Sequence, residues 1–294
     1  MQSTKSMFQI RQSTITWSSP KHPELSPSGD VQSLWWARHV RDFTQLSPTS
    51  VRFTALAVNV PRYIAHLHSR IRAHPHATII QASLPLSNGL PATLQQALTL
   101  AYLSPASCAG IVNALGLSAR RLYATDPSSI AQAETARLHP IRGQTVLARG
   151  ELREIRTLQS FDPSTGKTGI TYAIPRPGSG TTVLGGCNIK DDWSTEVDDV
   201  MTKEILQNCA KLVPELCKDG EFEVIKAQVG LRPGRTGGAR LEREMVRIGD
   251  WRDEVVVVHA YCMAGAGFQN SVGVARKVLS LLEGGYASEE RSKL

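Results

Sequence analysis

Cysteine and long apolar runs are both scarce in this sequence, and each absence excludes a class of protein. The five cysteines stand singly, without a CxxC pair, so the chain has no disulfide framework. No apolar stretch approaches the roughly 18–20 residues that span a bilayer. The residues from Met1 to Lys5 lack the hydrophobic core of a signal peptide. We therefore expect a soluble, intracellular protein without a membrane partner.

Concentrated positive charge is missing as well. The net charge is +7 at pH 7, and the basic residues are spread along the chain rather than stacked in one run. A nucleic-acid footprint needs a clustered basic patch with interleaved aromatic residues, so no nucleic-acid partner is expected. The hydrophobic fraction of 41% over 294 residues is enough for a packed core, and the length suits two domains or one large one.

Four histidines crowd one short segment, at positions His66, His68, His74 and His76. Residues two apart on a helix face different directions, and no cysteine or carboxylate joins the group. We therefore expect solvated surface histidines and no metal site.

The segment 51–60 alternates and is rich in residues that favour strands, so it predicts a β-strand. Asn59 is placed to cap a helix that begins just after it. The spacing of Ile64, Leu67 and Ile71 predicts the buried face of that helix.

Other segments give weaker patterns. Residues 1–34 predict irregular surface structure or strand fragments, and residues 117–137 are mixed and polar. Residues 84–103 show weak helical spacing interrupted by prolines, and residues 171–186 predict a hairpin.

A further helix is expected from Trp193 to about Leu212. Thr195 and Asp198 stand at capping-box spacing near its start. Its predicted apolar stripe consists of Val197, Val200, Met201, Leu206 and Cys209.

The most informative stretch runs from Val255 to Glu283. Val255–Val258 is a β-branched run typical of a buried strand, and the strand is expected to end at Tyr261. A turn of small residues follows, and helical spacing begins at Ser271. Gly284 then stands where a left-handed residue ends a helix.

Such a strand, turn and helix offers free backbone N–H groups and the positive end of a helix dipole to a ligand. Phosphates bind at such sites, and so does a flavin ring that becomes anionic on reduction. An ordinary βα turn has the same pattern, so this stretch alone leaves both interpretations open.

Several segments together resemble the D-amino-acid oxidase family of FAD enzymes. They occur in the family's order and cover roughly residues 34 to 283. The matching segments are Trp35-Trp36 with Asp42-Phe43, Val58–Tyr63, Val112–Leu117, Pro140–Gln144, Tyr172–Gly178, Leu184–Gly186 with Trp193, Val229–Pro233, and Val258–Gly273.

The resemblance implies an α/β fold in two interleaved domains. A substrate domain with a mixed β-sheet would comprise residues 1–60 and 150–234. Residues 61–149 and 235–294 would form the remnant of a Rossmann-like FAD-binding domain.

The resemblance also implies the substrate-binding residues. Arg232 is similar to the arginine that pairs with the substrate α-carboxylate, and Tyr172 to the tyrosine whose hydroxyl binds the same group. Outside this pattern they would be a structural ion-pair residue and a half-buried strand tyrosine. The Gly265 carbonyl matches the group that receives the substrate amine, and Gln269 lies near the amine and flavin in some members. Arg232 and Tyr172 are the residues to which the resemblance assigns a catalytic part.

The cofactor implied is FAD. The matching cofactor-binding positions are Val112, Arg142, Gly143, Gln144, Ala264, Gly265, Ala266, Gly267, Phe268 and Gln269.

The implied reaction needs no side-chain acid or base. The substrate's α-hydrogen passes as hydride to the flavin, and the imino acid formed hydrolyses to a keto acid and ammonia. Molecular oxygen is the second substrate and hydrogen peroxide a product. Protein groups supply orientation and charge placement.

Two alternatives to a D-amino-acid oxidase stay open. A D-aspartate oxidase would need a further cation for the side-chain carboxylate, which the sequence does not place. A truncated family fragment could act as a non-catalytic interaction module. A sarcosine-oxidase-like enzyme is disfavoured because those proteins do not share the Gly230–Pro233 block.

The sequence ends in Ser292-Lys293-Leu294, the peroxisomal address read at a free C-terminus. This tail predicts a peroxisomal location and an import receptor as partner. The resemblance leaves a homodimer open as the assembly.

The sequence departs from the family pattern in one large and three small ways. No strand–turn–helix with a Gly-x-Gly-x-x-Gly fingerprint is present, so exposed strand edges and an unfilled apolar face are expected. We hypothesise that this chain alone binds FAD weakly or not at all. Asn188 stands at the family's second active-site tyrosine, Leu115 at a usual threonine and Cys262 at a usual glycine.

Overall fold

The computed structural model describes residues 7–25, 31–124, 129–248 and 254–284, and it confirms the α/β fold. The helices are α1 (Val60–Arg72), α2 (Gly89–Leu100), α3 (Ala119–Tyr123), α4 (Ser129–Arg137), α5 (Asp199–Leu212) and α6 (Gly267–Leu282). The strands are β1 (Phe8–Trp17), β2 (Arg41–Ser47), β3 (Ser50–Val58), β4 (Ile111–Asn113), β5 (Leu138–Arg149), β6 (Ile155–Asp162), β7 (Lys167–Arg176), β8 (Thr181–Gly185), β9 (Ile189–Lys190), β10 (Val224–Arg235), β11 (Arg240–Arg247) and β12 (Glu254–Tyr261).

The chain divides into two compact units. The first comprises Met1–Thr78, Arg142–Asn188 and Ser194–Gly230, and the second Ile79–Ile141, Ile189–Trp193 and Leu231–Leu294. The bounds of these units differ from those of the two predicted domains. Residues 61–78 and 142–149, predicted in the cofactor domain, lie in the first unit, and residues 189–193 and 231–234, predicted in the substrate domain, lie in the second. Which unit binds cofactor and which binds substrate stays a prediction.

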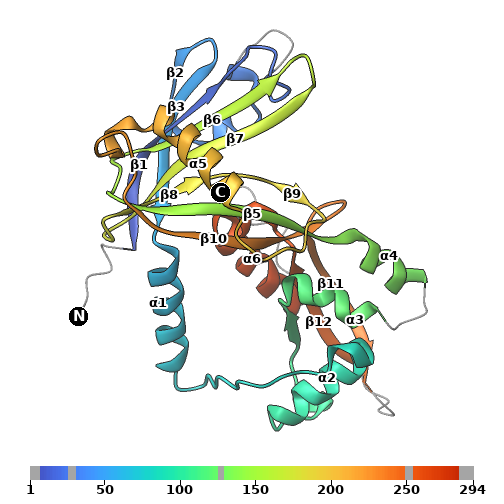
Figure 1. Ribbon diagram of the computed structural model, residues 1–294. Coiled ribbons are helices and arrows are strands. Elements are labelled where there is room, and N and C mark those ends of the chain that lie inside the picture. The colour runs from blue at the N-terminus through green and yellow to red at the C-terminus, as the bar shows by residue number, and fades with distance from the viewer. Residues whose placement is uncertain (1–6, 26–30, 125–128, 249–253, 285–294) are drawn as a thin grey trace. The chain divides into compact units, whose positions relative to one another are not determined.

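Most of a large mixed sheet belongs to the first unit (Figure 1). Its strands run in the order β10-β5-β8-β7-β6-β1-β3-β2, with β9 beside β5. Residues 1–34 were expected to be irregular or to form strand fragments, but β1 is a regular strand of 10 residues. It pairs antiparallel with β3 and parallel with β6, and its last residue, Trp17, is buried. Ladder pairing on both sides explains how so polar a segment forms a strand.

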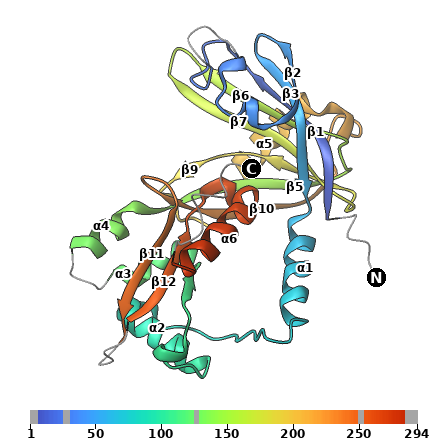
Figure 2. The same cartoon turned by 180° about the vertical axis from the view of Figure 1, so that it is seen from behind.

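The second unit contains a three-stranded sheet in the order β11-β12-β4. β12 pairs antiparallel with β11 and parallel with β4. The buried side chains of β12 pack with α2 and α3 in one core cluster, and α6 lies beside β11 and β12 (Figure 2). The predicted buried strand from Val255 to Tyr261 is confirmed.

The apolar stripe predicted to be buried on α1 is exposed. The helix begins where expected, yet Ile64, Leu67 and Ile71 are 49%, 39% and 48% exposed. No side chain of α1 is buried, because no described segment covers this stripe. Asn59 occupies the N-cap position, but its side-chain amide donates to the carbonyl oxygen of Pro177 (2.9 Å) instead of capping the helix.

Helix α5 starts later than predicted. It begins at Asp199, and the Asp198 carboxylate caps it by accepting the N–H of Met201 (3.0 Å), so the Thr195–Asp198 capping box is wrong. Val200 is 67% exposed, and the buried residues of the helix are Ile205 and Cys209. They pack against Ala173 and Leu184 of the sheet, so the buried side chains of α5 are those on the helix face that contacts the strands.

Two segments with weak patterns also form helices. Residues 84–103 contain α2, which tolerates Pro91 because proline in the first turn removes only an N–H without a helical partner. Residues 117–137 contain α3 and α4. Leu94, Leu122 and Ala131 from these helices enter the core of the second unit.

The second unit has the open edge and the exposed apolar side chains that the sequence predicted. Among the described residues β4 pairs only with β12, so its other edge is open. The large apolar side chains of this unit that are at least 43% exposed include Ile79, Ile80, Val112, Phe268, Val272 and Leu279. The last three lie along one face of α6.

Candidate functional site

The turn between β12 and α6 presents backbone to solvent. Ala264 and Gly265 are exposed in a short 3-10 turn over Ala264–Ala266, and α6 follows from Gly267 rather than from Ser271 as predicted. Ala266 offers no side-chain cap to the helix, and a Cβ added at Gly267 would meet nothing within 4 Å. Uncapped N–H groups at the start of a 16-residue helix can therefore be approached closely.

The far end of α6 behaves as the sequence predicted. The helix ends at Leu282, and Gly284 has a φ of 82°, in the left-handed region. Its N–H donates to the carbonyl oxygen of Leu281. Glycine suits this position because it has no Cβ to oppose that conformation.

The structure brings Arg232 and Gly265 together in the second unit. Arg232 lies near the end of β10, and a Cβ built on Gly265 would stand 3.9 Å from its Cδ. The side chain of Arg232 thus passes beside an exposed backbone turn, so that a cationic residue and a backbone carbonyl lie in the same region. Gln269 is exposed in the first turn of α6, and Phe268 is 48% exposed beside it.

Tyr172 belongs to the first unit and lies over the double glycine. It stands opposite Gly185 in the β7–β8 ladder. A Cβ at Gly185 would clash with the Cζ atom of Tyr172, and one at Gly186 would be 2.7 Å from its Cε1. The two glycines therefore provide the space for this ring. Asn188 is exposed just beyond them.

Arg142 and Gln144 are buried on β5, where they bind the backbone of the segment that leads into α5. Arg142 donates to the carbonyl oxygens of Ser194 (3.1 Å) and Glu196 (2.6 Å). Gln144 donates to the carbonyl oxygen of Asp198 (2.6 Å) and accepts the N–H of the same residue (2.9 Å). These bonds give both side chains a structural part, and their contact with a cofactor stays a prediction.

The remaining predicted cofactor positions are divided between the units. Gly143 is buried on β5 between Arg142 and Gln144, whereas Val112 is 43% exposed on β4 of the second unit. Leu115 follows β4, where its N–H donates to the Asn113 side-chain oxygen (3.2 Å).

A buried polar network in the second unit was missed by the sequence analysis. Glu134 of α4 receives hydrogen bonds from Arg235 and from the Tyr261 hydroxyl (2.9 Å). Arg240 donates to the Tyr261 hydroxyl (3.1 Å) and the Tyr123 hydroxyl (2.7 Å). These residues are far apart in sequence and share no motif spacing, so only the fold reveals them.

A second branch of the network runs through a histidine. His259 is fully buried, with its Nε2 2.9 Å from a Glu244 carboxylate oxygen and its Nδ1 3.1 Å from the Asn113 amide nitrogen. Arg240 donates to the same Glu244 oxygen (3.0 Å). The network thereby joins β4, β11 and β12.

Two carboxylates of this network make the stability of the protein decrease at acidic pH. Burial alone would raise the pKa of Glu134, but hydrogen bonds from Arg235 and Tyr261 outweigh it and lower the pKa. The hydrogen bond from His259 likewise lowers the pKa of Glu244. A lowered folded-state pKa gives stability that is complete above the unfolded value of 4.5 and is lost as pH falls through the folded value.

We therefore expect the thermal midpoint to fall as pH decreases from about 5 to about 3. The Glu134→Gln variant should show a shallower fall, because its side chain no longer titrates. Thermal melts across this range measure both curves. If the thermal midpoints of the two proteins fell equally with pH, Glu134 would not be a source of the pH dependence.

Cys262 is held in a conformation that suits glycine. Its φ is 63°, and its side chain is buried against the core of the second unit. Burial raises the pKa of Cys262 to about 11, so the thiol stays protonated and unreactive near neutral pH. Ala264, two residues later, has a φ of 49°.

Cys262→Gly should raise the free energy of unfolding by about 0.5–1 kcal/mol, because relief of the left-handed strain exceeds the loss of the small side chain. Cys209→Gly, at an equally buried cysteine in the helical backbone of α5, should lower it by about 1–2 kcal/mol. Urea unfolding of both variants gives the sign of each change in the free energy of unfolding. A lower free energy of unfolding in both variants would show that the backbone at Cys262 is not strained.

The residues of the β12–α6 turn fit a flavin. They combine exposed backbone, open space at Gly267 and an uncapped helix start near the Arg232 cation. When a flavin binds, the turn would hold it, and Arg232 would orient a substrate carboxylate beside it. The network behind the turn, through Tyr261, would fix its position.

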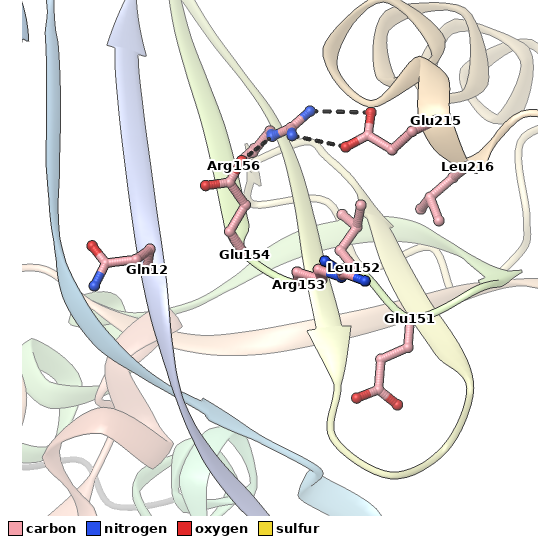
Figure 3. Close-up of a pocket in the computed structure, with 8 residues that line it drawn as sticks. All are labelled: Gln12, Glu151, Leu152, Arg153, Glu154, Arg156, Glu215 and Leu216. Atoms are coloured by element: carbon pink, nitrogen blue, oxygen red, sulfur yellow. Dashed lines mark hydrogen bonds and ion pairs between the residues drawn. The ribbon is translucent and has the colours of Figure 1, made fainter.

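The first unit also has a surface hollow of about 520 Å³ (Figure 3). Arg156 in its wall is paired with Glu154 (2.7 Å) and Glu215 (2.8 Å). None of the predicted site residues lines it, so it adds nothing to the candidate site. Among the described residues, no three histidine, cysteine or acidic side chains gather as a metal site requires. No described helix is both long and apolar enough to cross a membrane.

Comparison with known proteins gives consistent results. The model of a family described as FAD dependent oxidoreductase matches residues 59–281. A D-amino-acid oxidase of Schizosaccharomyces pombe is 28% identical over 268 residues, 87% of this chain and 66% of the relative. A D-aspartate oxidase of Talaromyces thermophilus is 36% identical over 154 residues, 52% of this chain and 38% of the relative. The chain thus spans about two thirds or less of the length of these relatives.

Two solved structures illustrate the similarity in fold. Glycine oxidase from Geobacillus kaustophilus has a TM-score of 0.60 and 15% identity, covering 94% of this chain and 71% of its own. L-alpha-Glycerophosphate Oxidase from Mycoplasma pneumoniae, with FAD bound, has a TM-score of 0.55 and 14% identity, covering 94% and 74%. At these identities the likeness concerns the fold alone.

Proposed function

Because the chain belongs to the FAD-dependent oxidoreductase family, we propose that it catalyses the FAD-dependent oxidation of D-amino acids. The products would be an imino acid, which hydrolyses to a keto acid and ammonia, and hydrogen peroxide from oxygen. The observation that carries the proposal is the position of Arg232 beside the exposed Gly265 turn. One cation and one backbone carbonyl are the two partners that an amino acid's carboxylate and amine need.

The chain's own residues would bind and orient the substrate. Arg232 would pair with the α-carboxylate through two parallel hydrogen bonds, and the Gly265 carbonyl would accept from the amine. Tyr172 would add a hydrogen bond to the carboxylate. FAD, when bound, supplies the acceptor for the two electrons of the reaction. No titrating side chain is needed, because orientation places the α-hydrogen for transfer.

The decisive test is the visible spectrum of the purified chain with added FAD, before and after anaerobic D-alanine. Retained flavin absorbance that bleaches with D-alanine and not with L-alanine supports the proposal. Absence of retained flavin and of bleaching overturns it for this chain. The chain would then be a family fragment without this activity of its own.

D-Aspartate is the second candidate substrate. The comparison with the Talaromyces thermophilus D-aspartate oxidase favours it, although that match covers 52% of this chain. The same bleaching experiment with D-aspartate separates the two. Faster bleaching with D-aspartate than with D-alanine would make the acidic side chain the preferred one.

We also propose a peroxisomal location. This proposal rests on Ser292-Lys293-Leu294, three residues that lie outside the described part of the chain. An import receptor would read this tail at the free C-terminus. A fluorescent fusion at the N-terminus should be punctate and become diffuse when the tail is deleted. A homodimer, the assembly left open by the sequence, is tested by sedimentation of the purified chain.

A further inference from the structure

Glu134 is an unusual carboxylate because it is almost fully buried and has two partners from different strands. It is 6% exposed on α4. Its Oε2 accepts from the terminal nitrogen of Arg235 (2.8 Å), and its Oε1 accepts from the Tyr261 hydroxyl (2.9 Å). A buried carboxylate is stabilised only where such donors converge on it.

Each partner of Glu134 stands within four residues of a residue of the candidate site. Arg235 ends β10, three residues after Arg232. Tyr261 ends β12, directly before the turn that carries Gly265. One carboxylate therefore ties the strand with the substrate-binding cation to the strand that leads into the flavin-binding turn.

Further bonds prevent each strand from relaxing independently. Arg240 of β11 donates to the same Tyr261 hydroxyl (3.1 Å), and its guanidinium carbon lies 6.0 Å from the centre of the Tyr261 ring. The N–H of Thr236, just after β10, donates to the carbonyl oxygen of Arg137 at the end of α4 (2.9 Å). Hydrogen bonds thus join β12 to both α4 and β11, and they join the end of β10 to α4.

We propose that Glu134 is a positioning residue that holds Arg232 and the Gly265 turn in register, so that one D-amino acid can engage both. This inference rests on the proposed function. Glu134 itself touches no substrate and acts through Arg235 and Tyr261.

Two variants test the network. Glu134→Gln keeps the shape but replaces one acceptor oxygen with a donor, which faces the donors of Arg235 or Tyr261. Tyr261→Phe removes only the hydroxyl and leaves Glu134 paired with Arg235. Glu223→Gln is the matched control, because Glu223 also pairs with an arginine but is 62% exposed in the first unit.

The first readout does not need the flavin. Cys262 follows Tyr261 and is buried, so its rate of labelling by N-ethylmaleimide reports opening of the turn. Cys209, buried in the first unit, reports unfolding there. In both network variants we expect Cys262 to be labelled about tenfold faster, as loss of one buried hydrogen bond implies, with Cys209 unchanged. Unchanged Cys262 labelling, or equal acceleration of both cysteines, would overturn the proposal.

The second readout is the KM for D-alanine in the chain loaded with FAD. Glu134→Gln should raise KM about tenfold, because Arg232 and the turn no longer present both partners together, whereas Glu223→Gln should leave it unchanged. An unchanged KM in Glu134→Gln with faster Cys262 labelling would overturn the link to Arg232. If the unaltered chain does not oxidise D-alanine, the proposed function fails while the labelling comparison still decides whether Glu134 holds the turn.

Discussion

Arg232→Leu is expected to lower kcat/KM for D-alanine by about 10³-fold. Arg232 is the cationic residue whose side chain lies beside the Gly265 turn, and its removal would leave the substrate carboxylate desolvated without a partner. Truncating one member of such a charge pair costs about 2–5 kcal/mol, which corresponds to factors of about 10² to 10⁴. Steady-state oxidation of D-alanine, followed by hydrogen peroxide release, measures the effect.

Arg243→Leu is the matched control for this substitution. Arg243 lies on β11 of the same unit and is exposed, so its loss should change kcat/KM by no more than about twofold. The absorbance of bound FAD should be similar in both variants, which would separate substrate binding from cofactor binding. Activity of Arg232→Leu within tenfold of the unaltered chain would remove Arg232 from the carboxylate site.

Arg240→Leu is expected to lower the free energy of unfolding by about 3 kcal/mol. The Arg240 side chain is 10% exposed and pairs with Glu244 (3.0 Å) while donating to two tyrosine hydroxyls. Breaking a buried ion pair from one side costs about 3–5 kcal/mol because a charge is left unpaired. The lower end applies here, because Glu244 is 42% exposed and keeps His259 as a partner.

The control for Arg240→Leu is Arg247→Leu on the same strand. Arg247 is exposed at the end of β11, so its replacement should change the unfolding free energy by less than about 0.5 kcal/mol. Urea unfolding gives both values, with labelling of Cys262 reporting the second unit separately. Equal small effects in the two variants would show that the network adds little to stability.

The outcome for α1 shows where helical periodicity is insufficient. The spacing of Ile64, Leu67 and Ile71 correctly predicts a helix, because side chains three or four apart share one face. It does not determine whether another segment covers that face, and here the stripe is exposed. Helix formation depends on neighbours in sequence, whereas burial depends on residues that are distant along the chain.

The buried network shows the complementary limit. Glu134 and Tyr261 are separated by 127 positions, and they meet because α4 and β12 pack in the same unit. In sequence, the surroundings of Glu134 mix polar and apolar residues and give no clear signal of its burial. A charged residue is assigned to the surface by default, and only a fold that supplies Arg235 and Tyr261 reverses that assignment.

The sequence by itself determined the strand from Val255 to Tyr261, the turn of small residues after it and the glycine that ends α6, because local sterics and periodicity decide these features. Its ordered motifs also indicated the family, which the match over residues 59–281 confirms. Only the tertiary structure placed the Arg232 side chain beside Gly265 and buried Glu134 against Arg235 and Tyr261. These are contacts between separate strands and helices, and their free energy exists only when the chain is folded.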